Sequence, residues 1–343
     1  MNTQWFLGAQ TARGFISKFD DLHDDPRIQK LIILKGGPGC GKSTFMKKLL
    51  HTAHQLGAET ESYPCASDPD SLDGILILPL GLAFVDGTAP HVMEPELCGC
   101  GESYLNLGCF YDTKGLATEK DALQGLQKSY RALFPGVYAH LNAAEALRQS
   151  IRSTMKASNP AGLHRLMEAL GGEIQPSEHG SGIRREVFFR TYTPSGEYSL
   201  VHGGIAVVDP WGLCAPLFAR LQSHYLHAGY DCICALSPLA PKRLEGIMIP
   251  ELHTTYFTCE KAPADSTVTI FPERFFTGAP EITAMGEAVN DHLEQAMTLM
   301  KKAKQLHDEM ELRYRPYVSF EGLELLTQEY QKTIKADLLS LKK

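Results

Sequence analysis

The chain has 343 residues, of which 43% are apolar and 21% are charged, as is usual for a globular protein with a buried core. The formal net charge of −7 offers no general attraction for nucleic acid, so no nucleic-acid partner is expected. The longest uncharged apolar run, residues 74–85, is too short to span a bilayer, so no membrane partner is expected. The N-terminus has no secretory pattern and the nine cysteines have no metal-binding spacing, which favours a cytoplasmic protein with free thiols.

A phosphate-binding motif follows the first apolar run, residues 31–34, which has the pattern of a strand buried on both faces. The next residues, GGPGCGKST, match G-x-x-x-x-G-K-[ST] and lead into a helical pattern. Glycines let backbone N–H groups face phosphates, and the helix N-terminus adds the positive end of its dipole. The sequence therefore predicts that ATP is bound by the loop residues Gly36, Gly37, Pro38, Gly39, Cys40, Gly41, Lys42, Ser43 and Thr44.

Three of these side chains have separate expected contacts. Lys42 is expected to contact the β- and γ-phosphates and to act in catalysis, Ser43 to hold Mg²⁺, and Thr44 to contact the α-phosphate side. Asp86, which follows the apolar run 82–85, is interpreted as the carboxylate that holds Mg²⁺ through water. The alternative is that Asp86 only caps a turn. Gly87 stands where many motor ATPases carry a second acid, which leaves slow hydrolysis, kinase-like or switch-like chemistry open.

A second acidic cluster, Asp68, Asp70 and Asp73, follows the predicted strand 59–66. Ligands of open α/β sheets bind beyond the carboxyl ends of strands. Asp68 or Asp70 could therefore accept a proton from a substrate hydroxyl or orient water. The alternative is an Asp-Pro turn with helix-capping acids.

Each half ends in segments whose apolar residues recur at three- and four-residue spacing, as in helices. These segments are 118–134 and 137–157 in the first half, and 281–314 and 320–343 in the second. They predict helices that pack on their own domain or form hairpins. Residues 171–186 are rich in Gly, Ser and Pro and predict a linker between a domain at 1–170 and a domain at 187–343.

The two halves repeat one another. A shift of 172 residues aligns them without gaps from the first strand through the third, so that 72–86 falls on 244–258. An earlier stretch, 6–15, matches 188–197 at a shift of 182, and the difference falls in the polar segment 20–29, interpreted as a loop insertion. The repeat predicts two tandem α/β domains of the P-loop NTPase type, each a mostly parallel sheet with flanking helices, plus C-terminal helical hairpins.

The second copy lacks the residues that phosphate chemistry needs. The matched pairs are Gly36 and Val208, Gly37 and Asp209, Gly39 and Trp211, Gly41 and Leu213, Lys42 and Cys214, Ser43 and Ala215, Thr44 and Pro216, and Asp86 and Thr258. The Asp209 carboxylate is expected to repel a phosphate, at a cost of about 4 kcal/mol per charge pair at about 4 Å and an effective dielectric near 20. The second copy is therefore expected not to bind Mg·nucleotide.

With its tandem arrangement, the chain resembles an uncharacterised bacterial family of proteins with two successive P-loop ATPase-like domains. The resemblance covers nearly the whole length and rests on FLGAQTARGF, GGPGCGKST, DPDSLDG and VDGTAPH in the first copy and FFRTYTPSGE in the second. The second loop, VDPWGLCAP, departs from the usable P-loop that many family members carry there. The resemblance implies ATP binding and hydrolysis and names no substrate.

Three functions remain open. The first is Mg²⁺-dependent ATP binding with slow hydrolysis in the first copy, the second copy being structural or regulatory. Arg13, Arg184 and Arg185 are candidates for contact with the γ-phosphate, although ordinary solvated arginines fit each position better. The second is a small-molecule or nucleotide kinase, with Asp68 or Asp70 as base. The third is a nucleotide-gated protein-interaction module without turnover; a further small-molecule or protein partner and a homo-oligomer stay open.

Overall fold

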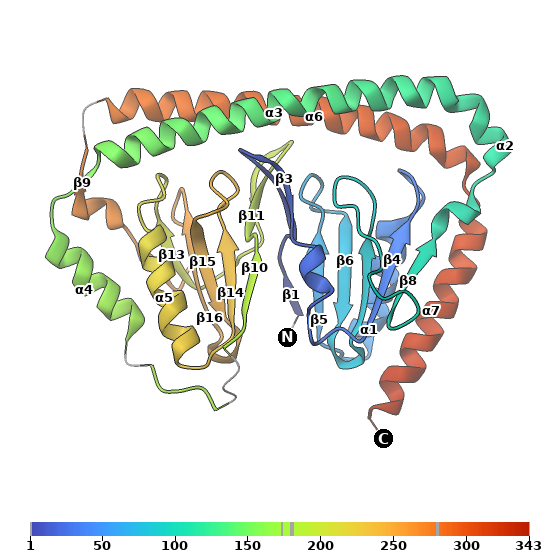
Figure 1. Ribbon diagram of the computed structural model, residues 1–343, viewed down its shortest axis with the longest axis horizontal. Coiled ribbons are helices and arrows are strands. Elements are labelled where there is room, and N and C mark those ends of the chain that lie inside the picture. Colours follow the sequence, from blue (N-terminus) through green and yellow to red (C-terminus); the bar gives the residue numbers. More distant parts are fainter. Residues whose placement is uncertain (1, 173, 179–181, 279–280, 343) are drawn as a thin grey trace.

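The computed structural model describes residues 2–172, 174–178, 182–278 and 281–342. Two six-stranded sheets stand side by side, and two long helices run across both of them (Figure 1). The predicted α/β class is therefore confirmed, and two sheets are compatible with two domains. Within the described part of the chain, no helix is both long and apolar enough to cross a membrane.

The two sheets have the same strand order and the same directions. In the first, the order is β1 (Asn2–Gln4), β5 (Thr60–Pro64), β6 (Leu72–Ile77), β7 (Leu82–Asp86), β4 (Lys30–Lys35) and β8 (Glu102–Asn106). In the second, it is β10 (Arg184–Val187), β14 (Cys232–Leu236), β15 (Leu244–Ile249), β16 (Thr254–Cys259), β13 (Ile205–Val208) and β17 (Val268–Ile270). Both sheets are mixed, because β6 and β15 run antiparallel to both of their neighbours.

The apolar run 74–85 explains why one strand of each sheet is reversed. It holds two strands, β6 and β7, joined by a tight turn at Leu78–Leu80 and by Gly81, whose φ is +54°. A connection this short joins antiparallel neighbours, whereas parallel neighbours need a crossover of a dozen or more residues. Asp73, expected beyond a strand end, consequently lies within β6.

The hairpins near the start of each half bear out the repeat at a shift of 182. They are β2 (Gly8–Thr11) with β3 (Gly14–Ser17), and β11 (Arg190–Thr193) with β12 (Gly196–Ser199). Phe6 and Phe188, which match in the repeat, donate a 2.9 Å backbone hydrogen bond to each other. Antiparallel pairing of matching residues places a local twofold relation between the halves at this point.

The expected gapless shift of 172 is wrong in one strand. Ile32 of β4 pairs with Phe84 of β7, but in the second sheet Ile205, not residue 204, pairs with Tyr256. Strand β13 is thus related to β4 by a shift of 173 residues. Pairing at the shift of 172 would turn every side chain of β13 to the opposite face of the sheet, because side chains alternate between the two faces along a strand. The loop that follows β13, 209–214, has the same length as its counterpart, 36–41, and the one-residue difference falls in the helix, since α5 has 13 residues and α1 has 14.

Helices cover the outer face of each sheet, while the inner faces share a core. Ile33 and Val85 of the first sheet lie in one buried cluster with Ala206 and Phe257 of the second. The outer helices are α1 (Lys42–Gln55) and α7 (Phe320–Ser340) on the first sheet, and α5 (Ala215–His227) and α4 (Pro160–Gly171) on the second. Each sheet is therefore covered by one helix from its own half and one from the other half.

The two long helices account for this exchange. Helix α3 (Lys120–Thr154) and helix α6 (Ile282–Tyr314) lie against each other across both sheets and carry the chain from one half to the other (Figure 1). The expected break between 134 and 137 is absent, since α3 continues through Pro135 and buries Val137 and Leu141 against α6. The remaining short elements are α2 (Thr113–Leu116), β9 (Lys156–Ala157) and β18 (Phe276–Thr277).

The predicted division at 171–186 does not describe this packing, because α4 precedes it yet packs on the second sheet, and α7 follows it yet packs on the first. Strand β10 begins at Arg184, inside the predicted linker. Positions 173 and 179–181 of that linker lie outside the described residues.

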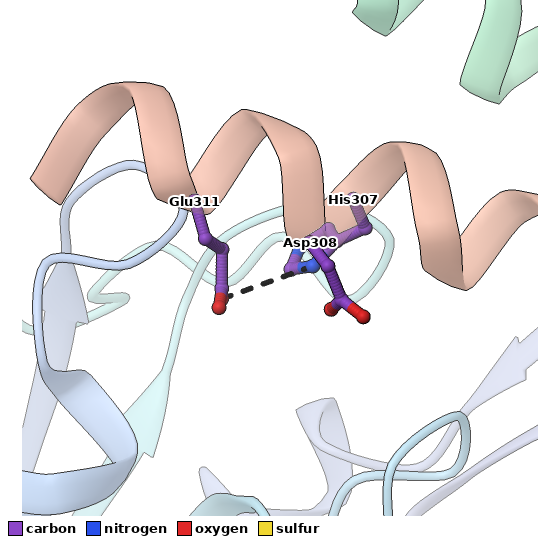
Figure 2. Close-up of side chains that lie close together, drawn as sticks. All are labelled: His307, Asp308 and Glu311. Atoms are coloured by element: carbon purple, nitrogen blue, oxygen red, sulfur yellow. Dashed lines mark ion pairs between the residues drawn. The ribbon is translucent and has the colours of Figure 1, made fainter.

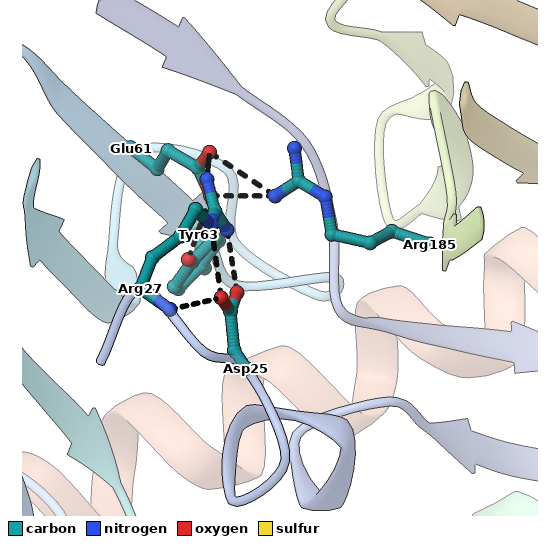
Figure 3. Close-up of polar contacts among 5 residues, drawn as sticks. All are labelled: Asp25, Arg27, Glu61, Tyr63 and Arg185. Atoms are coloured by element: carbon teal, nitrogen blue, oxygen red, sulfur yellow. Dashed lines mark hydrogen bonds and ion pairs between the residues drawn. The ribbon is translucent and has the colours of Figure 1, made fainter. Parts of the chain in front are cut away.

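A buried ionic cluster joins the two sheets (Figure 3). Glu61 of β5, only 3% exposed, accepts hydrogen bonds from Arg27, from Tyr63 at 3.0 Å and from Arg185 of β10 at 3.2 Å. Arg27 is also bonded to Asp25 at 2.9 Å. Burial alone would lower the pKa of Arg27, but its bonds to Asp25 and Glu61 raise it above its ordinary value. The Glu61 carboxylate thus balances the charges of two arginines that come from different halves.

We expect Glu61→Gln to lower the free energy of unfolding by about 3 kcal/mol, because removing one partner of a buried pair leaves charge uncompensated. Urea unfolding followed by circular dichroism measures the change. The control is Glu96→Gln at an exposed position, expected to change stability by less than about 0.5 kcal/mol. A loss equal to that of the control would show that the cluster contributes nothing to joining the halves.

Candidate nucleotide site

The glycine-rich loop lies between the end of β4 and the start of α1, as the motif requires. Gly39 and Gly41 have φ values of +68° and +90°, a region that favours glycine. A side-chain carbon on Gly39 would come within 3.2 Å of the Glu311 carbonyl oxygen, and one on Gly41 within 2.5 Å of Leu323. The loop is therefore covered by α6 and α7, and the glycines also permit this close approach.

Lys42, the first residue of α1, lies beside Asp86, the last residue of β7. The Lys42 ammonium lies 3.5 Å from the Asp86 carboxylate and donates to the carbonyl oxygens of Gly36 at 2.8 Å and Gly37 at 3.2 Å. The Ser43 hydroxyl oxygen accepts a bond from the Leu72 N–H at 2.9 Å. An ammonium beside a carboxylate and a hydroxyl is a donor set for phosphate and a divalent cation.

The remaining predicted loop residues lie as follows. Cys40 is buried, and burial raises the pKa of its thiol, so this cysteine is poorly suited to act as a nucleophile. Pro38 is partly buried, and Thr44 is exposed on the first turn of α1.

His91, which the sequence did not single out, positions Asp86. Its Nδ1 lies 2.8 Å from the Asp86 carbonyl oxygen and donates to it, because a carbonyl oxygen can only accept a hydrogen bond. Its Nε2 lies 3.3 Å from the Asp73 carboxylate. Burial alone would lower the pKa of His91, but the hydrogen bond and charge of Asp73 raise it. One oxygen of Asp86 also accepts from the backbone and hydroxyl of Thr88, which leaves the other facing Lys42.

Asp68 and Asp70 lie in the loop between β5 and β6 but have different surroundings. Asp68 lies 3.4 Å from the Lys304 ammonium of α6 and accepts a bond from the Ser71 hydroxyl at 3.3 Å. Asp70 is exposed, and its backbone carbonyl accepts a hydrogen bond from Lys47. Lys304 is more than 200 residues away in sequence, so no spacing could have paired it with Asp68.

Three potential metal ligands project from α6 above the loop (Figure 2). The ligand atoms of His307, Asp308 and Glu311 lie within 4.8 Å of one another, and His307 Nδ1 is 3.8 Å from Glu311. Lys304 is already paired with Asp308 at 2.5 Å, which neutralises one of the two carboxylates. A cation at this cluster would have to compete with that ammonium, as a cation at Asp86 would have to compete with Lys42.

The three arginines considered for the γ-phosphate are engaged elsewhere. Arg184 pairs with Glu186. Arg185 is bonded to Glu61 and lies over the Trp5 ring, and Arg13 lines a cleft above the second loop.

The second loop is closed by its own side chain. Asp209 is buried, and its carboxylate accepts hydrogen bonds from the backbone N–H groups of Leu213 at 2.8 Å and Cys214 at 2.6 Å. The expectation that Asp209 would face a phosphate is wrong in its geometry, because the carboxylate itself takes the place at the loop amides that a phosphate would need. Trp211 points away from the loop and packs against Gly286 of α6.

Comparison of the chain with protein-family models, with curated proteins and with solved structures found no match. Its function is therefore inferred from the geometry of the described residues.

Proposed function

We propose that the first half is a P-loop NTPase domain that binds Mg·ATP and hydrolyses it slowly, and that the second half has a structural or regulatory role. The observation that carries this proposal is the pairing of Lys42 with Asp86 beside Ser43. A triphosphate with Mg²⁺ would replace the ion pair between Lys42 and Asp86 and the hydrogen bond that the Ser43 hydroxyl accepts. Phosphate oxygens would bind Lys42, while Ser43 and Asp86 would hold Mg²⁺. The resemblance to the family with tandem P-loop ATPase-like domains supports the same reading.

The side chains around the loop support a division of tasks in hydrolysis. Lys42 and the loop amides would offset the charge that develops on the phosphates. Asp68, held by Lys304, would orient the attacking water or accept its proton. Gly87 follows Asp86 and supplies no second carboxylate, which fits slow turnover.

The regulatory role is supported by the course of α6. Near its start, Gly286 contacts Trp211 of the second loop, and near its end, Glu311 and Tyr314 lie against Gly39 and Gly37 of the first loop. One rigid element therefore touches both loops. Nucleotide that alters the first loop would shift α6, and this also fits the alternative of a nucleotide-gated interaction module without turnover.

Titration calorimetry with ATP and Mg²⁺ tests the proposal, with phosphate release measured in parallel. We expect one site per chain and turnover well below the about 10 s⁻¹ typical of enzymes. Saturable binding without phosphate release would favour the gated module. Transfer of phosphate to a metabolite added in a mixture would favour a kinase, and two comparable sites or none would overturn the proposal.

A further inference from the structure

A cleft with an excess of positive charge lies above the second loop. Its volume is about 660 Å³, and its charged lining consists of Arg13, Arg152, Lys242, Arg243 and one acid, Glu145. This volume lies within the range of about 300–1,000 Å³ that is usual for small-molecule sites. The cleft continues into a narrow inner pocket with room for about one water molecule, about 20 Å³.

The charge of this region is reversed between the two halves. The strands that flank the loop at 237–243 keep the shift of 172, and the backbone bond from Ser237 to Arg243 at 2.9 Å matches that from Cys65 to Ser71 at 3.0 Å. At this shift, Asp68 is matched by Ala240, Asp70 by Lys242, Ser71 by Arg243 and Asp86 by Thr258. Three acids are therefore lost, one of them to Lys242, and a serine is replaced by Arg243, so the net charge of these positions changes from negative to positive.

The cations at the mouth are held in place but are only partly neutralised. Arg152 pairs with Glu145 and donates to the Trp211 carbonyl at 2.9 Å, and Arg243 donates to the Gly212 carbonyl. A side-chain carbon on Gly212 would lie 3.6 Å from the Arg152 guanidinium and 3.9 Å from that of Arg243, so the two like charges lie close together and repel each other. Burial, together with the charge of Arg152, lowers the pKa of Arg243. An anion between them would remove that repulsion.

Buried polar atoms without partners lie in the inner pocket. Among the described residues, the Nε of Arg148 and the hydroxyl of Thr258 are buried and make no hydrogen bond, and both residues line this pocket. Arg148 is 6% exposed and Thr258 is 8% exposed. Buried polar atoms are normally hydrogen-bonded, so these two are available to a water molecule or a ligand group in the pocket.

We propose that the second half binds a small polyanion without a metal ion, with phosphate or carboxylate groups held between Arg152 and Arg243. Lys242 and Arg13 would contact the outer part of the ligand, and the inner pocket would place Arg148 and Thr258 toward it through one water molecule. Asp209 keeps the loop amides occupied, so the ligand lies in the cleft and not in the loop.

Calorimetry in the presence of EDTA tests this site on the Lys42→Ala background, in which the first loop is disabled. The two probes are pyrophosphate and citrate, and we expect one saturable site per chain for at least one of them. Binding of pyrophosphate alone would assign phosphate groups, binding of citrate alone would assign carboxylates, and both results support the site. Failure of ATP binding at the first loop would not affect this measurement.

Substitutions locate the site. We expect Arg243→Gln and Arg152→Gln each to weaken binding by about tenfold or more, and Lys242→Gln, at an exposed position, by a few-fold without effect on folding. Lys114→Gln, which removes an exposed cation elsewhere, is the matched control and should change nothing. No saturable binding of either probe, or binding that Arg243→Gln and Lys242→Gln both leave unchanged, would overturn the proposal.

Discussion

Lys42→Ala is expected to weaken the binding of Mg·ATP by about 10- to 150-fold, because hydrogen bonds to charged groups contribute about 1.5–3 kcal/mol each. The Lys42 ammonium lies 3.5 Å from the Asp86 carboxylate, and its bonds to the carbonyl oxygens of Gly36 and Gly37 hold it at the loop. A triphosphate bound by the loop amides would therefore meet this charge directly. Titration calorimetry at constant Mg²⁺ measures the change.

The matched control is Cys214→Ala, at the position that a shift of 172 pairs with Lys42. Cys214 is buried, and its N–H is bonded to Asp209, so its thiol has no route to a phosphate. We expect ATP affinity to stay within about twofold of the wild type. If Lys42→Ala binds Mg·ATP as well as Cys214→Ala does, the first loop is not the nucleotide site.

The features that could be predicted from the sequence are those set by local patterns. The glycine-rich segment lies between a strand and a helix, and Asp86 ends the neighbouring strand. Both features could be predicted because each depends only on an apolar run and the residues that directly follow it. The repeated hairpins at a shift of 182 are of the same kind. The helix from 282 to 314 could likewise be expected from its spacing of apolar residues.

The features that could not be predicted depend on contacts between distant segments. The spacing in α7 shows an apolar face but not which sheet it covers, and that face packs on α1 of the other half. The segments 118–134 and 137–157 were expected as separate helices, yet packing against α6 keeps α3 continuous through Pro135. An alignment of apolar residues does not reveal the one-residue offset of β13, which appears only in the pairing of β13 with β16.

The candidate site likewise has features that could be predicted from the sequence and features that could not. His91 follows Asp86 by five residues, but its hydrogen bond to the Asp86 carbonyl and its contact with Asp73 required the fold, as did the pairing of Lys304 with the distant Asp68. Asp209 was recognised as incompatible with phosphate, but its bonds to Leu213 and Cys214 depend on how the loop folds back on the carboxylate. Residue types could thus be assigned, while their partners required the fold.

Asp68→Asn is expected to lower the rate of ATP hydrolysis by about 100- to 10,000-fold with little effect on Mg·ATP affinity, because a general base acts only when water is deprotonated. This range corresponds to about 3–5 kcal/mol. Asn keeps the size of the side chain and can still accept from Ser71, but it cannot take a proton. Single-turnover phosphate release, compared with calorimetric affinity, separates the two effects.

Asp70→Asn is the matched control, since Asp70 lies in the same loop and is exposed. We expect it to keep both affinity and turnover within about threefold of the wild type. If Asp68 served only to anchor α6 through Lys304, Asp68→Asn would behave as the loss of an ion pair at a half-buried site, worth about 1 kcal/mol of stability or less. Lys304→Met would then reproduce its effect on stability, and both variants would retain turnover. Retained turnover in Asp68→Asn would therefore assign the carboxylate to packing and leave the attacking water without a base from this loop.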